Sequence, residues 1–418
     1  MKQIIINGGK PLTGEIKISG AKNSAVALVP ASLLSDGVVK IDNIPNVSDI
    51  DALTETLEYL GAKVKRYDGL MEIDPTVIDN KVIPESLSKK LRASYYFMGA
   101  LLGKFKHVEM YFPGGCSIGA RPIDQTLKAF KLLGATIIEQ DDRYTITADK
   151  LVGAHIYLDM PSVGATINTL LASVRADGLT ILENAAKEPE VVNVATYLNN
   201  MGAKITGAGT SEIRIMGVNH LDGCFSEVIP DRIEAGTYTI LGALIGKELR
   251  ISNIIPDHIE SLLSKLKEMG VPIIINDDSL IISSVDIIKN TSIKTLGYPG
   301  FPTDLQQPLT TLLTQCSGTS RLEETIYENR FQNIQYLVKM GADITIKSER
   351  VIYIKGPTKL KGTSVVATDL RAGACMLLAG LKAIGTTTIT NVEHILRGYE
   401  NLIEKLTNVG ADITLVDE

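Results

Sequence analysis

A glycine-rich stretch around one cysteine is the most distinctive chemical feature of the sequence. It runs Phe112-Pro-Gly-Gly-Cys-Ser-Ile-Gly-Ala-Arg-Pro-Ile-Asp124, so Arg121 follows Cys116 by five residues. A nearby cation lowers the pKa of a thiol and makes it a usable acid or nucleophile. Lone cysteines are more often inert core residues, and we assign that role to the other three, Cys224, Cys316 and Cys375. For Cys116 we favour a role as an acid or nucleophile, because a glycine-rich loop does not need a buried cysteine for packing.

Basic and polar residues recur at corresponding places, just before predicted helices. Before apolar helices they are Lys22-Asn23, Leu91-Arg92, Pro161–Ala165, Pro230–Arg232, Pro302–Asp304 and Thr368–Arg371. A second set of helices is predicted to begin near Arg121, Glu188, Arg330 and Arg397. Free backbone N–H groups and the helix dipole make such positions anion sites, and basic side chains strengthen the effect. The pattern therefore predicts a substrate with several negative charges.

A structural interpretation competes with the functional one at three of these helix starts. Asp and Ser at such positions are often only N-caps, and both interpretations stay open for Asp231, Asp369 and Ser162. The five histidines show no metal-ligand spacing, and the four cysteines form no CxxC pair. The sequence therefore predicts neither a metal site nor a disulfide.

The elements that carry these residues repeat six times. A helix that ends in Gly and is followed by a strand recurs at intervals of 68 to 73 residues, with the glycines at 61, 134, 202, 270, 341 and 410. We expect each Gly to adopt the left-handed conformation that ends a helix, because only Gly adopts it at low cost.

A nearly all-apolar helix precedes each glycine-terminated helix. The predicted ranges are Ser24–Leu34, Ala93–Gly103, Ala165–Val174, Ala235–Gly246, Leu305–Gln315 and Ala372–Gly385. Helices that are apolar on all sides belong in an interior. The repeat therefore predicts α/β units in which sheets wrap around buried helices.

The two ends of the chain indicate how the repeats close. The last repeat has one strand too few, while Gln3–Asn7 and Gly14–Ile18 match strands that elsewhere precede a buried helix. We therefore expect the N-terminus to complete the last repeat. Three repeats would form a domain over 21–229 that carries the Cys116 loop, and 1–20 with 230–418 would form the other. Two such domains predict an active site in a cleft between them.

Composition is that of a soluble globular protein. Of 418 residues, 44% are hydrophobic and 22% charged, and no apolar run approaches the length of a membrane span. The first residues are too short an apolar stretch for a signal peptide, so we expect a cytoplasmic protein. The net charge of -6 argues against broad nucleic-acid binding.

Eight motifs together resemble those of the UDP-N-acetylglucosamine 1-carboxyvinyltransferases, and the resemblance runs nearly end to end. They are Gly20–Asn23, Pro113–Pro122, Pro161–Thr166, Asp231–Thr237, Phe301–Asp304, Glu328–Phe331, Asp369–Arg371 and Arg397–Glu400. The resemblance implies an enolpyruvyl transferase-like fold, a two-domain inside-out α/β barrel built from six repeated units. It also implies transfer of the enolpyruvyl group of phosphoenolpyruvate to the 3-hydroxyl of UDP-N-acetylglucosamine, by addition and elimination of phosphate. That reaction is the first committed step of peptidoglycan synthesis.

The resemblance further implies roles for individual residues. Cys116 matches the general acid at C3 of phosphoenolpyruvate, and Asp304 matches the carboxylate that accepts the hydroxyl proton. The phosphoenolpyruvate clamp would comprise Lys22, Arg121 and Arg397, with Arg92 and Arg371 close by. Sugar contacts would come from Asn23 and Ile326. The uridine-diphosphate side would comprise Arg121, Pro122, Ile123, Asp124, Gln125, Ser162, Val163 and Gly164. No cofactor and no obligate protein partner is implied.

Two other functions would fit six repeats around buried helices. The sister enzyme that uses shikimate 3-phosphate lacks a loop like Pro113–Arg121 with its thiol. A non-catalytic ring scaffold, such as a sliding clamp, would need basic residues along one continuous inner face. Here the basic residues gather at helix starts instead, so we favour the UDP-sugar reaction over both.

Overall fold

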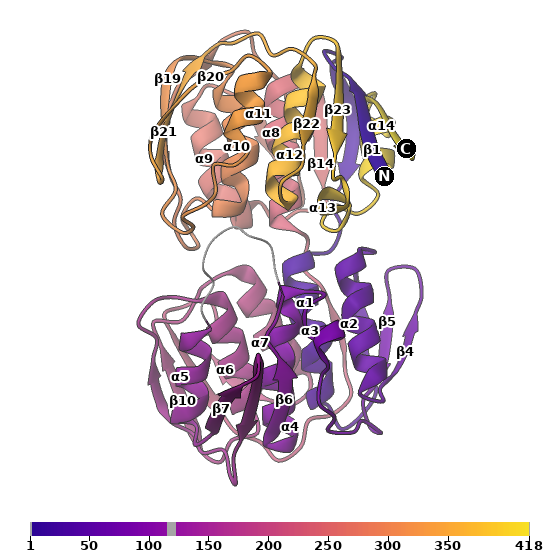
Figure 1. Cartoon of the computed structure of the whole chain (residues 1–418), viewed down its shortest axis with the longest axis vertical. Helices are drawn as coiled ribbons and strands as arrows, with labels where there is room; N and C mark the ends of the chain where they lie inside the picture. The colour runs from indigo at the N-terminus through magenta and orange to yellow at the C-terminus, as the bar shows by residue number, and fades with distance from the viewer. Residues whose placement is uncertain (1, 115–122, 418) are drawn as a thin grey trace. The chain divides into compact units, whose positions relative to one another are not determined.

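The computed structural model describes residues 2–114 and 123–417, which fall into two compact units (Figure 1). Unit 1 contains the described residues up to Ser19 and from Pro230 onward, and unit 2 contains those from Gly20 to Ile229. Each unit has an apolar core of its own. The chain therefore passes from one unit to the other after Ser19 and after Ile229.

Unit 2 contains three sheets, with strand orders β13-β3-β5-β4, β6-β8-β7 and β11-β12-β10-β9. The strands are β3 (Val39–Asp42), β4 (Lys63–Arg66), β5 (Met71–Asp74), β6 (His107–Tyr111), β7 (Thr136–Gln140), β8 (Arg143–Thr147), β9 (His155–Tyr157), β10 (Leu179–Glu183), β11 (Lys204–Thr206), β12 (Glu212–Met216) and β13 (Phe225–Glu227). The helices are α1 (Lys22–Ala31), η1 (Ser32–Leu34), α2 (Ser48–Tyr59), α3 (Glu85–Ser88), η2 (Arg92–Tyr95), α4 (Tyr96–Phe105), α5 (Asp124–Leu132), α6 (Val163–Ser173) and α7 (Pro189–Asn200).

Unit 1 also contains three sheets, with orders β22-β23-β1-β24, β15-β16-β14-β2 and β17-β19-β21-β20, where β18 also pairs with β19. The strands are β1 (Lys2–Asn7), β2 (Leu12–Lys17), β14 (Gly246–Ser252), β15 (Ile273–Ile275), β16 (Ser279–Ile282), β17 (Ile288–Lys289), β18 (Ser292–Lys294), β19 (Cys316–Glu323), β20 (Asp343–Ser348), β21 (Val351–Gly356), β22 (Ser364–Val366), β23 (Thr386–Thr390) and β24 (Asp412–Asp417). The helices are α8 (Arg232–Ile245), η3 (Pro256–Ile259), α9 (Glu260–Glu268), η4 (Thr303–Leu305), α10 (Gln306–Leu313), α11 (Ile334–Lys339), α12 (Leu370–Lys382), α13 (Glu393–Leu396) and α14 (Leu402–Asn408).

The six apolar segments form the interior helices, as predicted. In unit 2 these are α1, α4 and α6, and in unit 1 they are α8, α10 and α12, which lie side by side in Figure 1. Every residue of α10 is buried. Within the described residues, no helix combines the length and the apolar character needed to cross a membrane.

The six repeat glycines all end helices in the left-handed conformation, as the sequence predicted for them. Their φ angles lie between 86° and 106°. Each glycine stands two residues after the last residue of its helix, in the order α2, α5, α7, α9, α11 and α14. A Cβ at such a φ would be strained, so these positions favour Gly.

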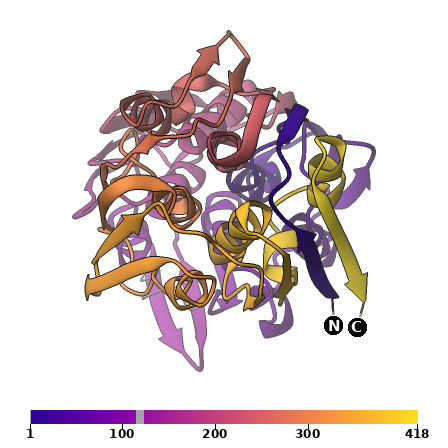
Figure 2. The same cartoon turned by 90° about the horizontal axis from the view of Figure 1, so that it is seen from above.

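The N-terminal strand completes the sheet of the last repeat. Strand β1 lies between β23 and β24 and pairs with both in antiparallel fashion, and Figure 2 shows the two chain ends beside each other. Strand β2 instead pairs in parallel with β14, whereas β13 pairs in parallel with β3. Strand β2 therefore belongs to a sheet of unit 1 and β13 to a sheet of unit 2. Each is the last strand before the chain passes to the other unit.

Two predicted helix starts are wrong. Helix α11 begins at Ile334, four residues after Arg330, and Arg397 is the residue that follows the short helix α13. Asn401 is left-handed, with a φ of 50°, and α14 begins only after it. Because this left-handed residue separates two short helices, Arg397 lies at a helix C-terminus rather than at an N-terminus.

Candidate active site

In unit 1, the Asp304 carboxylate lies between two arginines. Arg330 Nη2 donates to Oδ1 at 2.9 Å, and Arg371 Nη2 donates to Oδ2 at 3.1 Å. The arginine side chains are only 3% and 7% exposed, against 27% for Asp304. Burial alone would raise the pKa of Asp304, but Arg371 and Arg330 hold it well below its usual range. Asp304 is therefore ionised, and the cluster as a whole carries a net positive charge.

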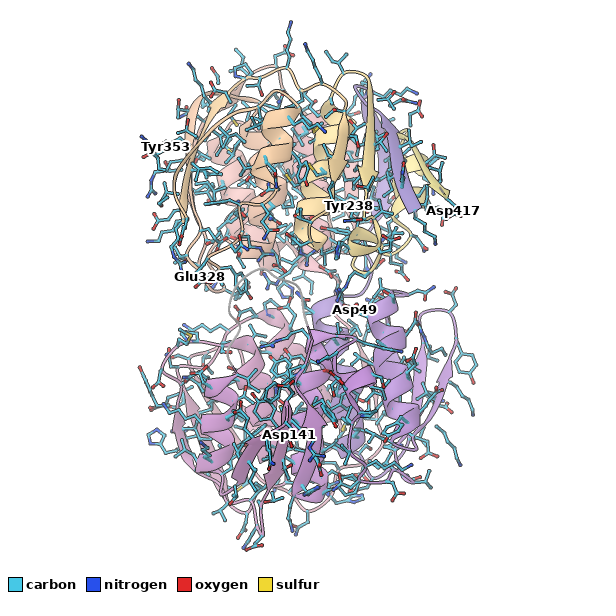
Figure 3. The ribbon with its side chains drawn as sticks, viewed as in Figure 1. Asp49, Asp141, Tyr238, Glu328, Tyr353 and Asp417 are labelled. Carbon is cyan, nitrogen blue, oxygen red and sulfur yellow. The ribbon has the colours of Figure 1, made fainter. Side chains whose placement is uncertain are left out.

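Arg371 is fixed by the starts of several helices. It is the second residue of α12, where Asp369 Oδ1 accepts its backbone N–H at 2.8 Å. Its Nη1 donates to the Tyr399 hydroxyl at 3.2 Å, and that hydroxyl shares a 2.9 Å hydrogen bond with Thr237 of α8. The starts of α8, α10 and α12 therefore meet around Asp304. The next residue of α8, Tyr238, lies in the interior of unit 1 (Figure 3).

The capping interpretation is confirmed at all three positions where it was open. Asp231 Oδ1 accepts the N–H groups of the first turn of α8 at 2.8 and 2.9 Å. Asp369 does the same for α12, and Ser162 Oγ accepts one N–H of α6 at 3.3 Å. These side chains satisfy backbone donors that a helix start leaves without partners.

In unit 2, Lys22 forms an ion pair with Asp49. It is the first residue of α1, and its Nζ lies 2.5 Å from Oδ2 of Asp49, in the first turn of α2. Both side chains are largely buried, and Asn23 follows as the second residue of α1. Asp49 is labelled in Figure 3. The ion pair fixes the direction of the lysine side chain relative to the helix start.

The starts of η2 and α6 also meet in unit 2. Arg92 lies over the Tyr95 ring, 5.8 Å from its centre. A Cβ at Gly164 would lie 1.4 Å from the Tyr95 hydroxyl oxygen. Gly164 therefore lies directly against the side chain of Tyr95, over whose ring Arg92 lies.

The start of α5 holds a third group of predicted residues. Gln125 is buried, and its Nε2 donates to Asp124 at 2.8 Å and to Asp159 at 3.1 Å. The backbone N–H of Asp159 donates back to Gln125 Oε1 at 2.9 Å. Ile123 precedes the helix. These contacts connect the start of α5 to the segment just before α6.

Three predicted residues, Cys116, Arg121 and Pro122, lie outside the described residues. Ile326 and Arg397 are described and belong to unit 1. Within residues 2–114 and 123–417, no group of three or more His, Cys, Asp or Glu side chains could hold a metal ion.

Sequence analysis missed Tyr399 and Asp49, two residues that position the site. Tyr399 stands inside the motif Arg397–Glu400 without an assigned role, and Arg330 was named only as a basic residue near a predicted helix start. Their importance appears only in their contacts with Asp304 and Arg371. Asp49 gave no signal, because a carboxylate in the first turn of a half-exposed helix also complements the helix dipole.

Comparison with known proteins defines the class. The family model of EPSP synthase (3-phosphoshikimate 1-carboxyvinyltransferase) matches residues 6–406. The enolpyruvyl transferase NikO from Streptomyces tendae is similar with a TM-score of 0.90 at 26% identity, over 99% of each chain. An EPSP synthase from Acinetobacter baumannii has a TM-score of 0.76 at 19% identity, over 100% of each chain, which supports the fold alone. The fold is that of the enolpyruvyl transferases.

Sequence relatives narrow the class. The UDP-N-acetylglucosamine 1-carboxyvinyltransferase 1 of Streptococcus agalactiae serotype Ia is 52% identical over 420 residues, covering 100% of both chains. The UDP-N-acetylglucosamine 1-carboxyvinyltransferase 2 of Listeria monocytogenes is 53% identical over 412 residues, covering 99% of this chain and 97% of the relative. The chain belongs to the family of UDP-N-acetylglucosamine 1-carboxyvinyltransferases.

Proposed function

We propose that the protein transfers the enolpyruvyl group of phosphoenolpyruvate to the 3-hydroxyl of UDP-N-acetylglucosamine. The hydroxyl oxygen bonds to C2 while C3 gains a proton. C3 then loses a proton and the C2–O bond to phosphate breaks, which releases phosphate and the enolpyruvyl ether. The reaction is the first committed step of peptidoglycan synthesis, and we place it in the cytoplasm. It uses no cofactor.

The observation that carries this proposal is the Asp304 cluster. A carboxylate that accepts a proton and two buried guanidiniums that attract an anion lie within hydrogen-bond distance of each other. Such fixed cations stabilise negative charge that develops during a reaction without having to reorganise. The identity of 52–53% with UDP-N-acetylglucosamine transferases supports the choice of acceptor.

Asp304 needs activation before it can act as a base. With both carboxylate oxygens bound to guanidiniums, its pKa lies well below its usual range, and it holds a proton poorly. Phosphoenolpyruvate is a trianion near neutral pH and competes for Arg330 and Arg371. We propose that this competition frees one carboxylate oxygen for the sugar hydroxyl. The base would then become effective only when the anionic substrate is bound.

The remaining roles follow the family. Cys116 donates the proton to C3, and Lys22, Arg121 and Arg397 hold phosphoenolpyruvate with Arg92 nearby. Asn23 and Ile326 contact the sugar. The diphosphate and uridine contacts are assigned to Arg121, Pro122, Ile123, Asp124, Gln125, Ser162, Val163 and Gly164.

The test is phosphate release from phosphoenolpyruvate with and without UDP-N-acetylglucosamine, in the native protein and in Cys116→Ala and Asp304→Asn. Release that requires the sugar nucleotide and falls about 100-fold or more in both variants is expected, because each removes a proton-transfer group. The matched control is Asp36→Asn, since Asp36 also lies between two cations, Lys104 and Arg175. Sugar-independent release, or full activity of Asp304→Asn, would contradict the proposal.

A further inference from the structure

Glu324 is a fully buried carboxylate that no role has yet explained. It directly follows β19 and is 0% exposed. Oε1 accepts the Thr295 hydroxyl at 2.9 Å and the backbone N–H groups of Ile326 and Tyr327 at 2.7 and 3.2 Å. Oε2 accepts the Thr303 hydroxyl at 2.8 Å. The two oxygens therefore connect three segments of unit 1, at Thr295, at Ile326–Tyr327 and at Thr303.

Further hydrogen bonds connect Thr303 with Asp304. The Thr303 hydroxyl donates to Glu324 and accepts Nη1 of Arg330 at 3.0 Å. The same guanidinium donates from Nη2 to Asp304 Oδ1 at 2.9 Å. An unbroken series of hydrogen bonds thus connects the backbone at Ile326 with the carboxylate of Asp304.

We propose that Glu324 is a positioning residue that couples the segment 325–327, which carries Ile326, to the Thr303–Arg330–Asp304 series. This inference rests on the proposed function, in which Ile326 contacts the sugar and Asp304 accepts its hydroxyl proton. Because its side chain is fully buried, Glu324 would act through these neighbours and not by contact with a substrate. It fixes the separation and orientation of the two groups between which the sugar must fit.

The chemistry of the site supports a specific role over simple filling of space. A buried carboxylate carries a large desolvation cost unless hydrogen bonds compensate for it. A glutamate side chain can accept hydrogen bonds on two oxygens, whereas a glutamine side chain has a single acceptor oxygen. The four donors around Glu324, two from the backbone and two from hydroxyls, use that property in full.

Thr303 offers the sharpest test, because two substitutions separate its hydroxyl from its methyl group. Thr303→Val keeps the shape and removes the hydroxyl, whereas Thr303→Ser keeps the hydroxyl and removes the methyl. We expect kcat for phosphate release to fall about 10- to 100-fold in Thr303→Val, because small misplacements of reacting groups cost that much. Thr303→Ser should stay within about threefold of the native protein on the same scale. Equal losses in both variants would show a packing role and overturn the inference.

Glu324→Gln tests the same bond from the other side. The amide oxygen can still accept from Ile326 and Tyr327, but its NH₂ group meets the Thr303 hydroxyl with a donor instead of an acceptor. We expect kcat to fall as in Thr303→Val, and the double variant to be no worse than the poorer single variant. Multiplied losses would mean that the two residues act independently, which would overturn the coupling.

The matched control is Glu323→Gln. Glu323 is the preceding residue, and it pairs at the surface with Arg321 at 2.7 Å and Lys294 at 3.4 Å. It should keep the native kcat and melting temperature. A fall in kcat equal to that of Glu324→Gln would show a general effect of losing charge at this strand end, and would contradict a specific role for Glu324.

A second readout does not depend on turnover. The amides of Ile326 and Tyr327 donate to Glu324 Oε1, and a carboxylate oxygen is a stronger acceptor than an amide oxygen. These two amides should therefore exchange with solvent faster in Glu324→Gln than in Glu323→Gln. Unchanged exchange would overturn the coupling even in an active enzyme. If the native protein released no phosphate, the proposed function would fail, and faster exchange would still support the connection between the two segments.

Discussion

The two units each hold a carboxylate between two cations, but at opposite ends of their buried helices. In unit 1, Asp304 lies where α8, α10 and α12 begin, between Arg330 and Arg371. In unit 2, Asp36 follows η1 and contacts Lys104 Nζ at 2.9 Å and Arg175 Nη2 at 2.6 Å. Burial alone would raise the pKa of both carboxyls, yet their cationic partners hold both well below the usual range.

The cations of the two clusters differ in the other groups to which they donate hydrogen bonds. Lys104 also donates to the backbone oxygen of Ser35, and Arg175 to that of Leu34, so these cations satisfy carbonyls at helix C-termini. Arg330 and Arg371 instead contact side-chain hydroxyls of Thr303 and Tyr399. A strongly lowered carboxyl pKa therefore does not identify an active site by itself. Its position at the start or end of the buried helices distinguishes a site from a structural cap.

The largest effect expected from this comparison is on catalysis at Asp304. Asp304→Asn keeps the shape and one acceptor oxygen but removes the base, so kcat for phosphate release should fall about 10²- to 10⁴-fold. Activity and thermal melting, measured together, separate loss of the base from unfolding. A kcat close to that of the native protein would place the base elsewhere.

The buried carboxylate Glu234 of unit 1 predicts a pH dependence of stability. It stands in the first turn of α8, where Lys405 Nζ lies at 2.7 Å and the Ser19 N–H donates at 2.8 Å. Burial raises its pKa from 4.5 to about 7 despite Lys405, and the nearby Asp231 adds to this. Folding therefore favours the protonated form, so this contribution is fully present below pH 4.5 and is lost as the pH rises to about 7.

The variant Glu234→Gln tests the direction of this pH dependence. Relative to this variant, the native protein should lose about 3 kcal/mol of stability between pH 4.5 and about 7, since each pKa unit corresponds to about 1.4 kcal/mol. Melting temperatures of both proteins at about pH 5 and about pH 8 measure the change. A difference between them that does not vary with pH would show that Glu234 titrates at its ordinary value.

A smaller, purely structural effect is expected at Asp36. Asp36→Asn leaves Lys104 and Arg175 partly buried with weaker partners, and we expect a loss of about 1–3 kcal/mol in unfolding free energy. The kcat should be unchanged. Because the pKa of Asp36 is lowered, its contribution is present at neutral pH and disappears in acid. A loss of activity without a loss of stability would remove the distinction between the two clusters.

The smallest effect on stability is expected at an exposed ion pair, which serves as the reference for the buried ones. Asp412 pairs with Lys10 at 2.7 Å, and the two side chains are 36% and 57% exposed. Exposed ion pairs contribute little because water and salt screen them, so Asp412→Asn should leave the unfolding free energy close to that of the native protein. Chemical denaturation of this variant beside Asp36→Asn would show whether burial, rather than pairing alone, makes the Asp36 cluster matter.

Much of the fold could be predicted from local signals. A glycine that ends a helix and an all-apolar helix are both visible in a few consecutive residues, and all twelve predictions of this kind were confirmed. The starts of the buried helices, and with them Asp304 and Arg371, followed directly. The β1 strand was also predictable, because the last repeat visibly lacks a strand.

What could not be predicted depends on contacts between residues far apart in the chain. Glu324, Tyr399 and Asp49 act through partners in other elements, and no period or motif marks such a contact. Arg330 and Arg397 were noticed, but their places at helix starts were wrong. Arg330 still reaches the site because its side chain extends back to the start of α10 from the segment before α11.

The most direct test of the central claim is a comparison of acceptors in one assay. Phosphate release from phosphoenolpyruvate should be rapid with UDP-N-acetylglucosamine and absent with shikimate 3-phosphate, and Asp304→Asn should abolish the difference. Mass spectrometry of the product should show the sugar nucleotide joined to an enolpyruvyl group. Release with shikimate 3-phosphate, or with neither acceptor, would contradict the assignment and leave only the enolpyruvyl transferase fold standing.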